Sequence, residues 1–199
     1  MRYFRLLIFT SFAFFGCAGA PTQELADARS AMIAAEEAHG KDTVGENLSV
    51  ARKYLNHAEM QLELGNYSDA KAHALLARRE ATRARNIAVA LEEAKRALAR
   101  AQAVQASSAA LEQAFNETLR AAQLKDEAQT IAMSGKTVIL AVQNENRVQL
   151  QEAKVKLNEC GDIAAIMRRS PDLWREAQMA ISRDQGALAL EYATTLCKR

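Results

Sequence analysis

The stretch of sequence that decides the fold runs from residue 67 to residue 100 and reads YSDAKAHALLARREATRARNIAVALEEAKRALAR. Residues with favourable helix propensity, above all Ala, Leu, Glu, Lys and Arg, make up most of it. No Gly or Pro occurs between Tyr67 and Ser134. A continuous helix over that span would be roughly 100 Å long. We therefore expect one long central helix, with any bend near residues 106–108.

Helix breakers divide the rest of the chain into shorter helices. The predicted helices run from Thr22 to about Glu37, from Asn47 to Leu64, from Thr137 to Glu159, from Pro171 to about Ser182 and from Ala187 to Cys197, with breaks at Gly65-Asn66, Ser134-Gly135, Cys160-Gly161 and residues 184–186. The helix after Gly135 carries one stripe, formed by Ile139, Val142, Asn146, Leu150, Ala153 and Leu157. The fold class that follows is all-α.

An internal repeat supports helical hairpins. Six positions of residues 55–74 recur 119 residues later: Leu55, Ala58, Met60, Leu62, Ala70 and Ala74 correspond to Trp174, Ala177, Met179, Ile181, Ala189 and Ala193. Small Ala side chains let two antiparallel helices approach closely, as in tetratricopeptide-like units. We expect elongated hairpins around the long central helix. The divisions are 17–90 (hairpin domain), 91–160 (long helix and antiparallel return helix) and 161–199 (C-terminal hairpin).

The start of the chain has the parts of an export signal in order. Residues 1–5 contain Arg2 and Arg5, and the ten residues that follow are apolar except for Thr10 and Ser11. A bilayer core needs about 20 apolar residues in helical form, so this run is too short to span it. We expect residues 1–16 to be a signal peptide.

The end of this signal resembles the lipobox of bacterial lipoprotein precursors. The residues FFGC at 14–17 place the small Gly16 before Cys17, where that pattern implies cleavage and acylation of the cysteine sulfur. A lipid anchor with two or three acyl chains holds a protein on a membrane almost permanently. Ala18, where inner-membrane lipoproteins have Asp, implies sorting to the outer membrane, facing the periplasm.

Further segments resemble a family of bacterial envelope lipoproteins whose shared Ala-rich helical hairpin has no assigned function. They read CAGAPT at 17–22, LNHAE at 55–59 and GNYSDA at 65–70, and the likeness extends over about residues 17–90. Longer relatives also carry an OmpA-like domain that binds peptidoglycan, but nothing after residue 90 resembles it. The resemblance implies location and shape, and it assigns no chemistry.

Charge and reactive residues argue against nucleic-acid binding and catalysis. Without the signal, Lys plus Arg falls from 26 to 24, equal to the 24 Asp plus Glu. Acids and bases alternate along helices, as in the segment EEAKR at 92–96. His occurs only at positions 39, 57 and 73, and no nucleophile, base and acid form a set. We expect no enzyme, no cofactor and no nucleic-acid partner.

Two motifs that suggest other chemistry have simpler interpretations. The residues SGKT at 134–137 resemble the end of a phosphate-binding loop, but Thr130 stands where that loop needs Gly, so we interpret them as a turn between helices. His57 and His73 lie eight residues on either side of Gly65, with Glu59 nearby. Structural zinc sites use four ligands, so we predict no metal site.

Cys160 and Cys197 are the two cysteines left after Cys17 is assigned to lipid. In an oxidising compartment we favour a disulfide between them, the alternative being free thiols or pairing between molecules. Two functions then compete. The first is a non-enzymatic, lipid-anchored periplasmic scaffold or adaptor that binds envelope proteins. The second is a ligand-binding or regulatory factor for peptidoglycan machinery, whose groove candidates are the aromatic residues Tyr54, Tyr67, Trp174 and Tyr192.

Overall fold

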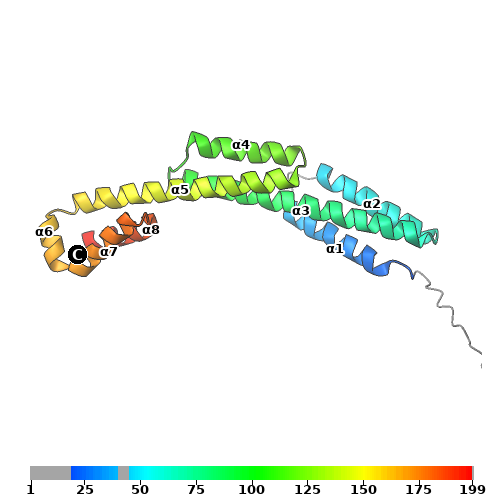
Figure 1. Cartoon of the computed structure of the whole chain (residues 1–199), viewed down its shortest axis with the longest axis horizontal. Coiled ribbons are helices and arrows are strands. Elements are labelled where there is room, and N and C mark those ends of the chain that lie inside the picture. Colours follow the sequence, from blue (N-terminus) through cyan, green and yellow to red (C-terminus); the bar gives the residue numbers. More distant parts are fainter. Residues whose placement is uncertain (1–18, 40–44, 199) are drawn as a thin grey trace, which may run out of the picture.

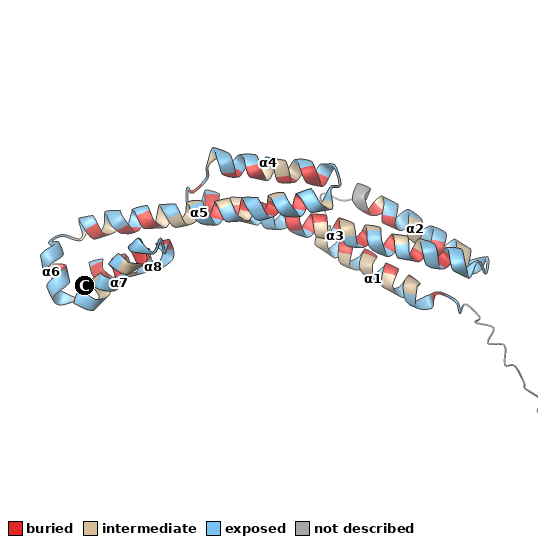
Figure 2. Ribbon diagram, viewed as in Figure 1, coloured by how far each residue is buried: buried red, intermediate tan, exposed pale blue. Residues whose placement is uncertain are grey.

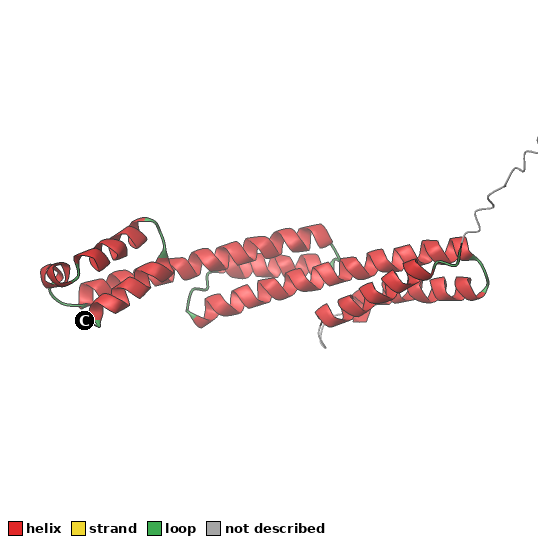
Figure 3. Cartoon of the chain, turned by 90° about the horizontal axis from the view of Figure 1, so that it is seen from below, coloured by secondary structure: helices red, strands yellow, loops and turns green. Residues whose placement is uncertain are grey.

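A computed structural model describes residues 19–39 and 45–198, and within them every regular element is a helix. The helices are α1 (Thr22–His39), α2 (Gly45–Glu63), α3 (Tyr67–Ala103), α4 (Ala109–Gln123), α5 (Glu127–Glu159), α6 (Ile163–Arg169), α7 (Pro171–Ser182) and α8 (Gly186–Cys197). The all-α prediction is confirmed. The closer likeness to tetratricopeptide units stays a prediction. Figures 1 and 3 show an elongated molecule in which the helices other than α6 lie roughly along one long axis.

The helices form three overlapping units, and in each unit a return helix connects two parallel helices that pack directly on one another. In the first unit α1 lies parallel to α3, because Glu24 pairs with Lys71 at 2.6 Å and Asp27 pairs with Arg78 at 3.2 Å. Residue numbers therefore increase in the same direction along both helices. The helix α2 runs in the opposite direction and packs on α3, while α1 and α3 are in direct contact.

The second and third units repeat this arrangement. The amide of Asn86 in α3 donates to Glu127 in α5 at 2.7 Å, and further along Arg100 lies 3.9 Å from Glu145, so α3 and α5 are parallel. The return helix is α4. In the third unit Asn146 of α5 contacts Gly186 of α8 and Cys160 is joined to Cys197, so α8 lies parallel to α5. The return helix is α7, and α3 and α5 each belong to two units.

The expected long central helix is wrong in two respects. The chain turns at residues 104–108 and again at 124–126, and α5 runs parallel to α3, whereas we expected an antiparallel return helix. Polar caps explain the breaks. At the start of α4, the Ser108 hydroxyl accepts from the backbone N–H of Leu111 at 3.3 Å. At the start of α5, the Asp126 carboxylate accepts from the backbone N–H of Gln129 at 3.0 Å.

The predicted break at Ser134-Gly135 is also wrong, because both residues lie inside α5. The neighbouring helices provide the reason. The Ser134 hydroxyl donates to the carbonyl oxygen of Ala90 in α3 at 2.6 Å, which fixes this part of α5 against α3. Tertiary packing thus overrides the weak helix propensity of Gly135. The short helix α6 was not predicted.

Three turns that lead from a return helix into the next parallel helix share one geometry. The residues with positive φ are Gly65 (78°), Lys125 (57°) and Asp184 (58°), and they are 60 and 59 residues apart. In each turn the following backbone N–H donates to the carbonyl five residues earlier, as in Asn66 to Gln61 at 2.9 Å. This is the Schellman pattern of a helix end.

These spacings reveal a repeat of about 60 residues with three copies. Buried positions of the return and parallel helices correspond as Ala58, Thr118 and Ala177, as Ala70, Thr130 and Ala189, and as Ala74, Ser134 and Ala193. The sequence comparison over 119 residues found the outer two copies. It missed the middle copy because hydroxyl side chains replace alanines there.

Alanine lines most of the helix interfaces. Ten of the eleven buried residues of α3 are Ala, and Ile87 is the exception. Small side chains allow the close approach of helices on several sides of α3. Figure 2 shows the consequence, since buried residues form narrow bands along each helix and most of the surface between them is exposed.

Candidate functional site

One face of α5 is apolar along most of the helix. It runs through Ile131, Gly135, Ile139, Val142, Asn146, Leu150, Ala153 and Leu157, at steps of three or four residues. That spacing puts all eight on one side of the helix. The sequence predicted the stripe from Ile139 onward. The structure adds Ile131 and Gly135 at its N-terminal end, because α5 begins before the predicted break.

Only the C-terminal half of this face is covered. Leu150, Ala153 and Leu157 are buried in a core cluster that also contains Ala189 and Ala193 of α8. The N-terminal half is open to solvent. We call it the open face of α5, and it consists of Ile131 (48% exposed), Gly135, Ile139 (58%) and Val142 (51%).

The boundary between the two halves is a tight contact at Asn146. The side-chain Nδ2 of Asn146 donates to the backbone carbonyl oxygen of Asp184 at 2.7 Å. The side-chain Oδ1 of Asn146 accepts from the backbone N–H of Gly186 at 2.6 Å. A Cβ on Gly186 would lie 2.5 Å from the backbone oxygen of Asn146. This contact fixes the point where α8 begins, so α8 covers α5 only beyond Asn146.

The fold itself does not require the open face to be apolar. One repeat earlier, the corresponding positions of α3 are Lys71, Leu75, Arg79 and Thr82, all exposed. Only Leu75 among them is a large apolar residue, and two are cationic. Because polar residues suit this position in α3, the three large apolar side chains of α5 have no structural explanation within the described residues.

Hydroxyl groups hold the opposite side of α5 in place. The Thr118 hydroxyl of α4 lies 3.2 Å from that of Thr137, and both are fully buried. Ser134 bonds to α3 as described above. Buried polar groups that find partners fix one arrangement of helices. The open face is therefore presented by a helix whose rotation about its axis is fixed.

An ion pair borders the open face. The Lys136 ammonium lies 3.3 Å from the Glu117 carboxylate of α4. Hydrogen bonds from Gln113 and from Lys136 hold the pKa of the Glu117 carboxyl below its ordinary range. At the far end of the molecule, a hydrogen bond from Lys71 similarly lowers the pKa of Glu24.

An open cleft of about 900 Å³ lies on α3, beside the N-terminus of α5. Its lining includes Leu75, Leu76, Arg79, Arg83 and Glu127. The guanidinium of Arg83, which lines the cleft, donates to the backbone oxygen of Lys125. The cleft occupies the place on α3 that corresponds to the open face on α5.

The four aromatic groove candidates do not form one site. Trp174 and Tyr192 each pack against the core cluster formed by α5, α6, α7 and α8, which is a structural role. Tyr54 packs against the cluster between α1, α2 and α3. Tyr67 is exposed at the turn between α2 and α3.

The two histidines on either side of Gly65 do meet. The rings of His57 and His73 stack with centroids 5.5 Å apart. The ring centroids of Tyr54 and His73 are 6.1 Å apart. Nδ1 of His73 is buried without a hydrogen-bond partner in the structure. Within residues 19–39 and 45–198, no three His, Cys, Asp or Glu side chains are grouped so that they could hold a metal ion.

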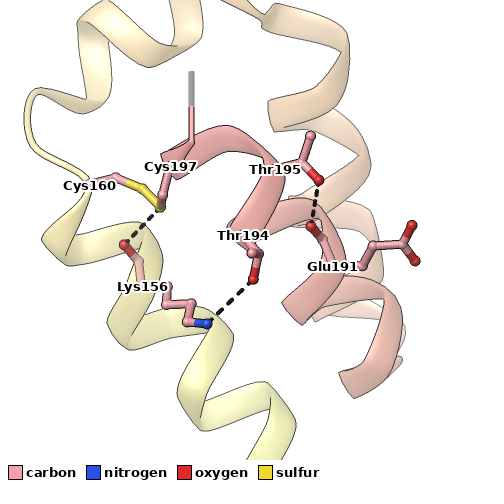
Figure 4. The surroundings of a disulfide bond; sticks show 6 residues. All are labelled: Lys156, Cys160, Glu191, Thr194, Thr195 and Cys197. Atoms are coloured by element: carbon pink, nitrogen blue, oxygen red, sulfur yellow. Dashed lines mark hydrogen bonds between the residues drawn. A yellow bond between two sulfur atoms is a disulfide. The ribbon is translucent and has the colours of Figure 1, made fainter.

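The cysteines divide between the described and undescribed parts of the chain. A disulfide joins Cys160 at the end of α5 to Cys197 at the end of α8, with Cα atoms 5.2 Å apart, and this is the pairing that the sequence favoured. Figure 4 shows the Cys197 sulfur beside the backbone oxygen of Lys156. Gly16 and Cys17 lie outside the described residues.

None of the helices in the described part is long and apolar enough to cross a membrane. Comparisons of the chain with protein-family models, with curated proteins and with solved structures give no match.

Proposed function

We propose that this chain is a non-enzymatic scaffold of the bacterial cell envelope, anchored by lipid at Cys17 to the outer membrane and facing the periplasm. Its open face on α5 recruits an envelope protein by binding an amphipathic helix. The observation that carries the proposal is the half-covered apolar stripe of α5, in which α8 occupies one half and Ile131, Ile139 and Val142 are exposed on the other.

The covered half indicates what the open half can bind. There α8 packs its residues Ala189, Ala193 and Leu196 on α5, at steps of four and three. A partner helix with small and apolar residues at the same steps would continue the line of α8 towards the N-terminus of α5. The open face spans residues 131–142, so it offers such a helix about three turns, roughly 17 Å.

The proposed location rests on the sequence of the N-terminus. The basic start, the short apolar run and the Gly16-Cys17 pair together favour export and acylation. The Cys160–Cys197 disulfide agrees with an oxidising compartment such as the periplasm.

Site-specific crosslinking in cells tests the recruitment. A photo-activated amino acid at Ile139 should crosslink to a discrete envelope protein, while the same amino acid at Gln151, which is exposed on another face of α5, should not. Ile131→Asp should abolish the Ile139 crosslink because a charge on the face disfavours an apolar partner. Cys17→Ala should weaken it by releasing the protein from the membrane. Equal crosslinking from Ile139 and Gln151 would show that the open face has no specific partner.

The cleft on α3 favours a second candidate function, the binding of an anionic cell-wall fragment. Arg78, Arg79 and Arg83 line the cleft beside the apolar Leu75 and Leu76. Guanidinium groups suit the carboxylates of peptidoglycan peptides. Titration with soluble peptidoglycan fragments would show binding that Arg79→Ala weakens. Unchanged affinity in that variant would remove this candidate.

A further inference from the structure

We propose that the turn between α2 and α3 rests in the headgroup region of the membrane, with Leu64 and Tyr67 as the inserted side chains. The inference depends on the proposed lipid anchor at Cys17. It adds that the body of the protein touches the bilayer at one defined place, so that the anchor and the turn together fix how the molecule stands on the surface.

The covalent chain brings the two features to the same end of the molecule. Cys17 is two residues before Gly19, where the described chain begins, and two residues span at most about 7 Å. The first turn of α1 lies beside the turn, because Leu25 packs with Leu62 in one cluster. Glu24 also pairs with Lys71 in the first turn of α3 at 2.6 Å. Figure 1 shows the start of α1 and the α2–α3 turn at the same end.

The side chains at this end suit a membrane interface. Leu64 is 65% exposed and Tyr67 is 40% exposed. Tyr is enriched at the level of lipid headgroups, where its ring is in an apolar layer and its hydroxyl is in a wet one. Glu63 and Asp69 flank the turn, so a zwitterionic surface suits it better than a strongly anionic one.

Exposure alone does not single out Leu64. Leu124 holds the same position in the turn of the middle repeat and is 70% exposed. It lies far from the anchor, because Arg83 of α3 contacts the neighbouring Lys125, 16 residues after Tyr67. At the rise of an α-helix this is about 24 Å along α3. Leu124 is therefore a matched control. It is the same residue type at the same position of the same kind of turn, but it lies farther from the anchor along α3.

The experiment uses the chain from Cys17 to Arg199, and each variant carries a single Trp. Trp174→Phe is introduced in every variant, together with Leu64→Trp, Tyr67→Trp or Leu124→Trp. The Cys17 thiol is coupled to a maleimide phospholipid in phosphatidylcholine vesicles, so the test does not depend on biological acylation. Fluorescence is compared between vesicles with ordinary and with brominated acyl chains.

We expect brominated lipid to quench Trp at 64 and at 67 at least twofold, and to leave Trp at 124 unquenched. Without coupling, the quenching at 64 should disappear. Equal quenching at all three positions, or none at 64 and 67, would overturn the proposal. A blue shift at 64 without quenching would also overturn it, because a protein surface would then cover the turn. A separate assay of acyl labelling in cells, with Cys17→Ala as control, tests the anchor itself.

Discussion

At the scale of single residues, the type of residue at a turn position with positive φ should affect the stability of the protein. Gly65 has positive φ in the first repeat, while Gln105, at the turn between α3 and α4, carries a side chain at φ 55°. A side chain in the left-handed region costs roughly 1–2 kcal/mol. The two positions therefore differ in how well the residue type suits the same conformation.

Exchanging the residue types should change stability in opposite directions. We expect Gly65→Ala to lower the free energy of unfolding by about 1 kcal/mol and Gln105→Gly to raise it by roughly 0.5 kcal/mol. Nothing lies within 4 Å of a Cβ built on Gly65, so the loss would come from the backbone alone. Urea unfolding with an unchanged m-value measures both. A gain in stability for Gly65→Ala would contradict the assigned conformation.

The ion pair beside the open face should make stability depend on pH. Because the pKa of Glu117 is lowered in the folded state by Gln113 and Lys136, its contribution is complete above the unfolded pKa of about 4.3. It is lost as the pH falls through the lower, folded pKa. Between pH 5 and pH 3 the melting temperature of the wild type should therefore fall more than that of Glu117→Gln. Parallel curves for the two proteins would mean that Glu117 does not contribute.

Residue patterns predicted some turns and missed others for a physical reason. Gly65, Gly161 and Pro171 are strong helix breakers, and the helix ends that they predict lie beside all three in the structure. The turn at Gln105 lies beside residues 106–108, where a bend was expected, whereas the turn at Lys125 was not predicted and contains neither Gly nor Pro. The signal at Lys125 is the cap Asp126, which single-sequence reasoning cannot distinguish from ordinary polar residues on a helix surface.

At the scale of helices, the start of α8 determines how much of α5 is covered. Gly186 is required there because a Cβ would lie 2.5 Å from the backbone of Asn146. Gly135, in the interior of α5, has open space around its Cβ position. The two glycines thus form a matched pair, one needed for close approach and one dispensable for packing.

We expect Gly186→Ala to destabilise the protein by about 1–3 kcal/mol, since α8 must move away from α5. Gly135→Ala should instead stabilise it by roughly 0.5–1 kcal/mol, because Ala favours a helix interior. Thermal unfolding followed by circular dichroism compares them. A neutral effect of Gly186→Ala would mean that α8 is not seated against Asn146.

The candidate site illustrates what helix patterns can and cannot show. The stripe from Ile139 to Leu157 is visible in the sequence, and the structure contains it. The sequence gives no sign that α8, with 12 residues, covers only part of α5, with 33. Which half of the stripe is open depends on the lengths of α5 and α8, which are distant in the sequence. It also depends on the contact between Asn146 and Gly186, which fixes where α8 begins along α5.

At the scale of the whole molecule, each unit contacts only its neighbours, so local damage should stay local. The disulfide closes a loop between residues 37 apart, which corresponds to about 4 kcal/mol of loop entropy. In Cys160→Ser/Cys197→Ser, amide hydrogen exchange should speed up in α6, α7 and α8 and stay slow in α1 to α3. Uniform acceleration along the chain would show that the molecule unfolds as one unit.

The parallel overlap of α3 and α5 also determines how the molecule responds to mechanical force. If one end is held and the other is pulled, α3 is drawn towards the first end and α5 towards the second. The overlap between Asn86 and Arg100 of α3 and their partners Glu127 and Glu145 of α5 is then loaded as a lap joint in shear. All contacts along such a joint bear the load together, whereas a hairpin pulled at its open end separates one turn at a time. Tension along the length of the molecule would therefore have to break the contacts between α3 and α5 together.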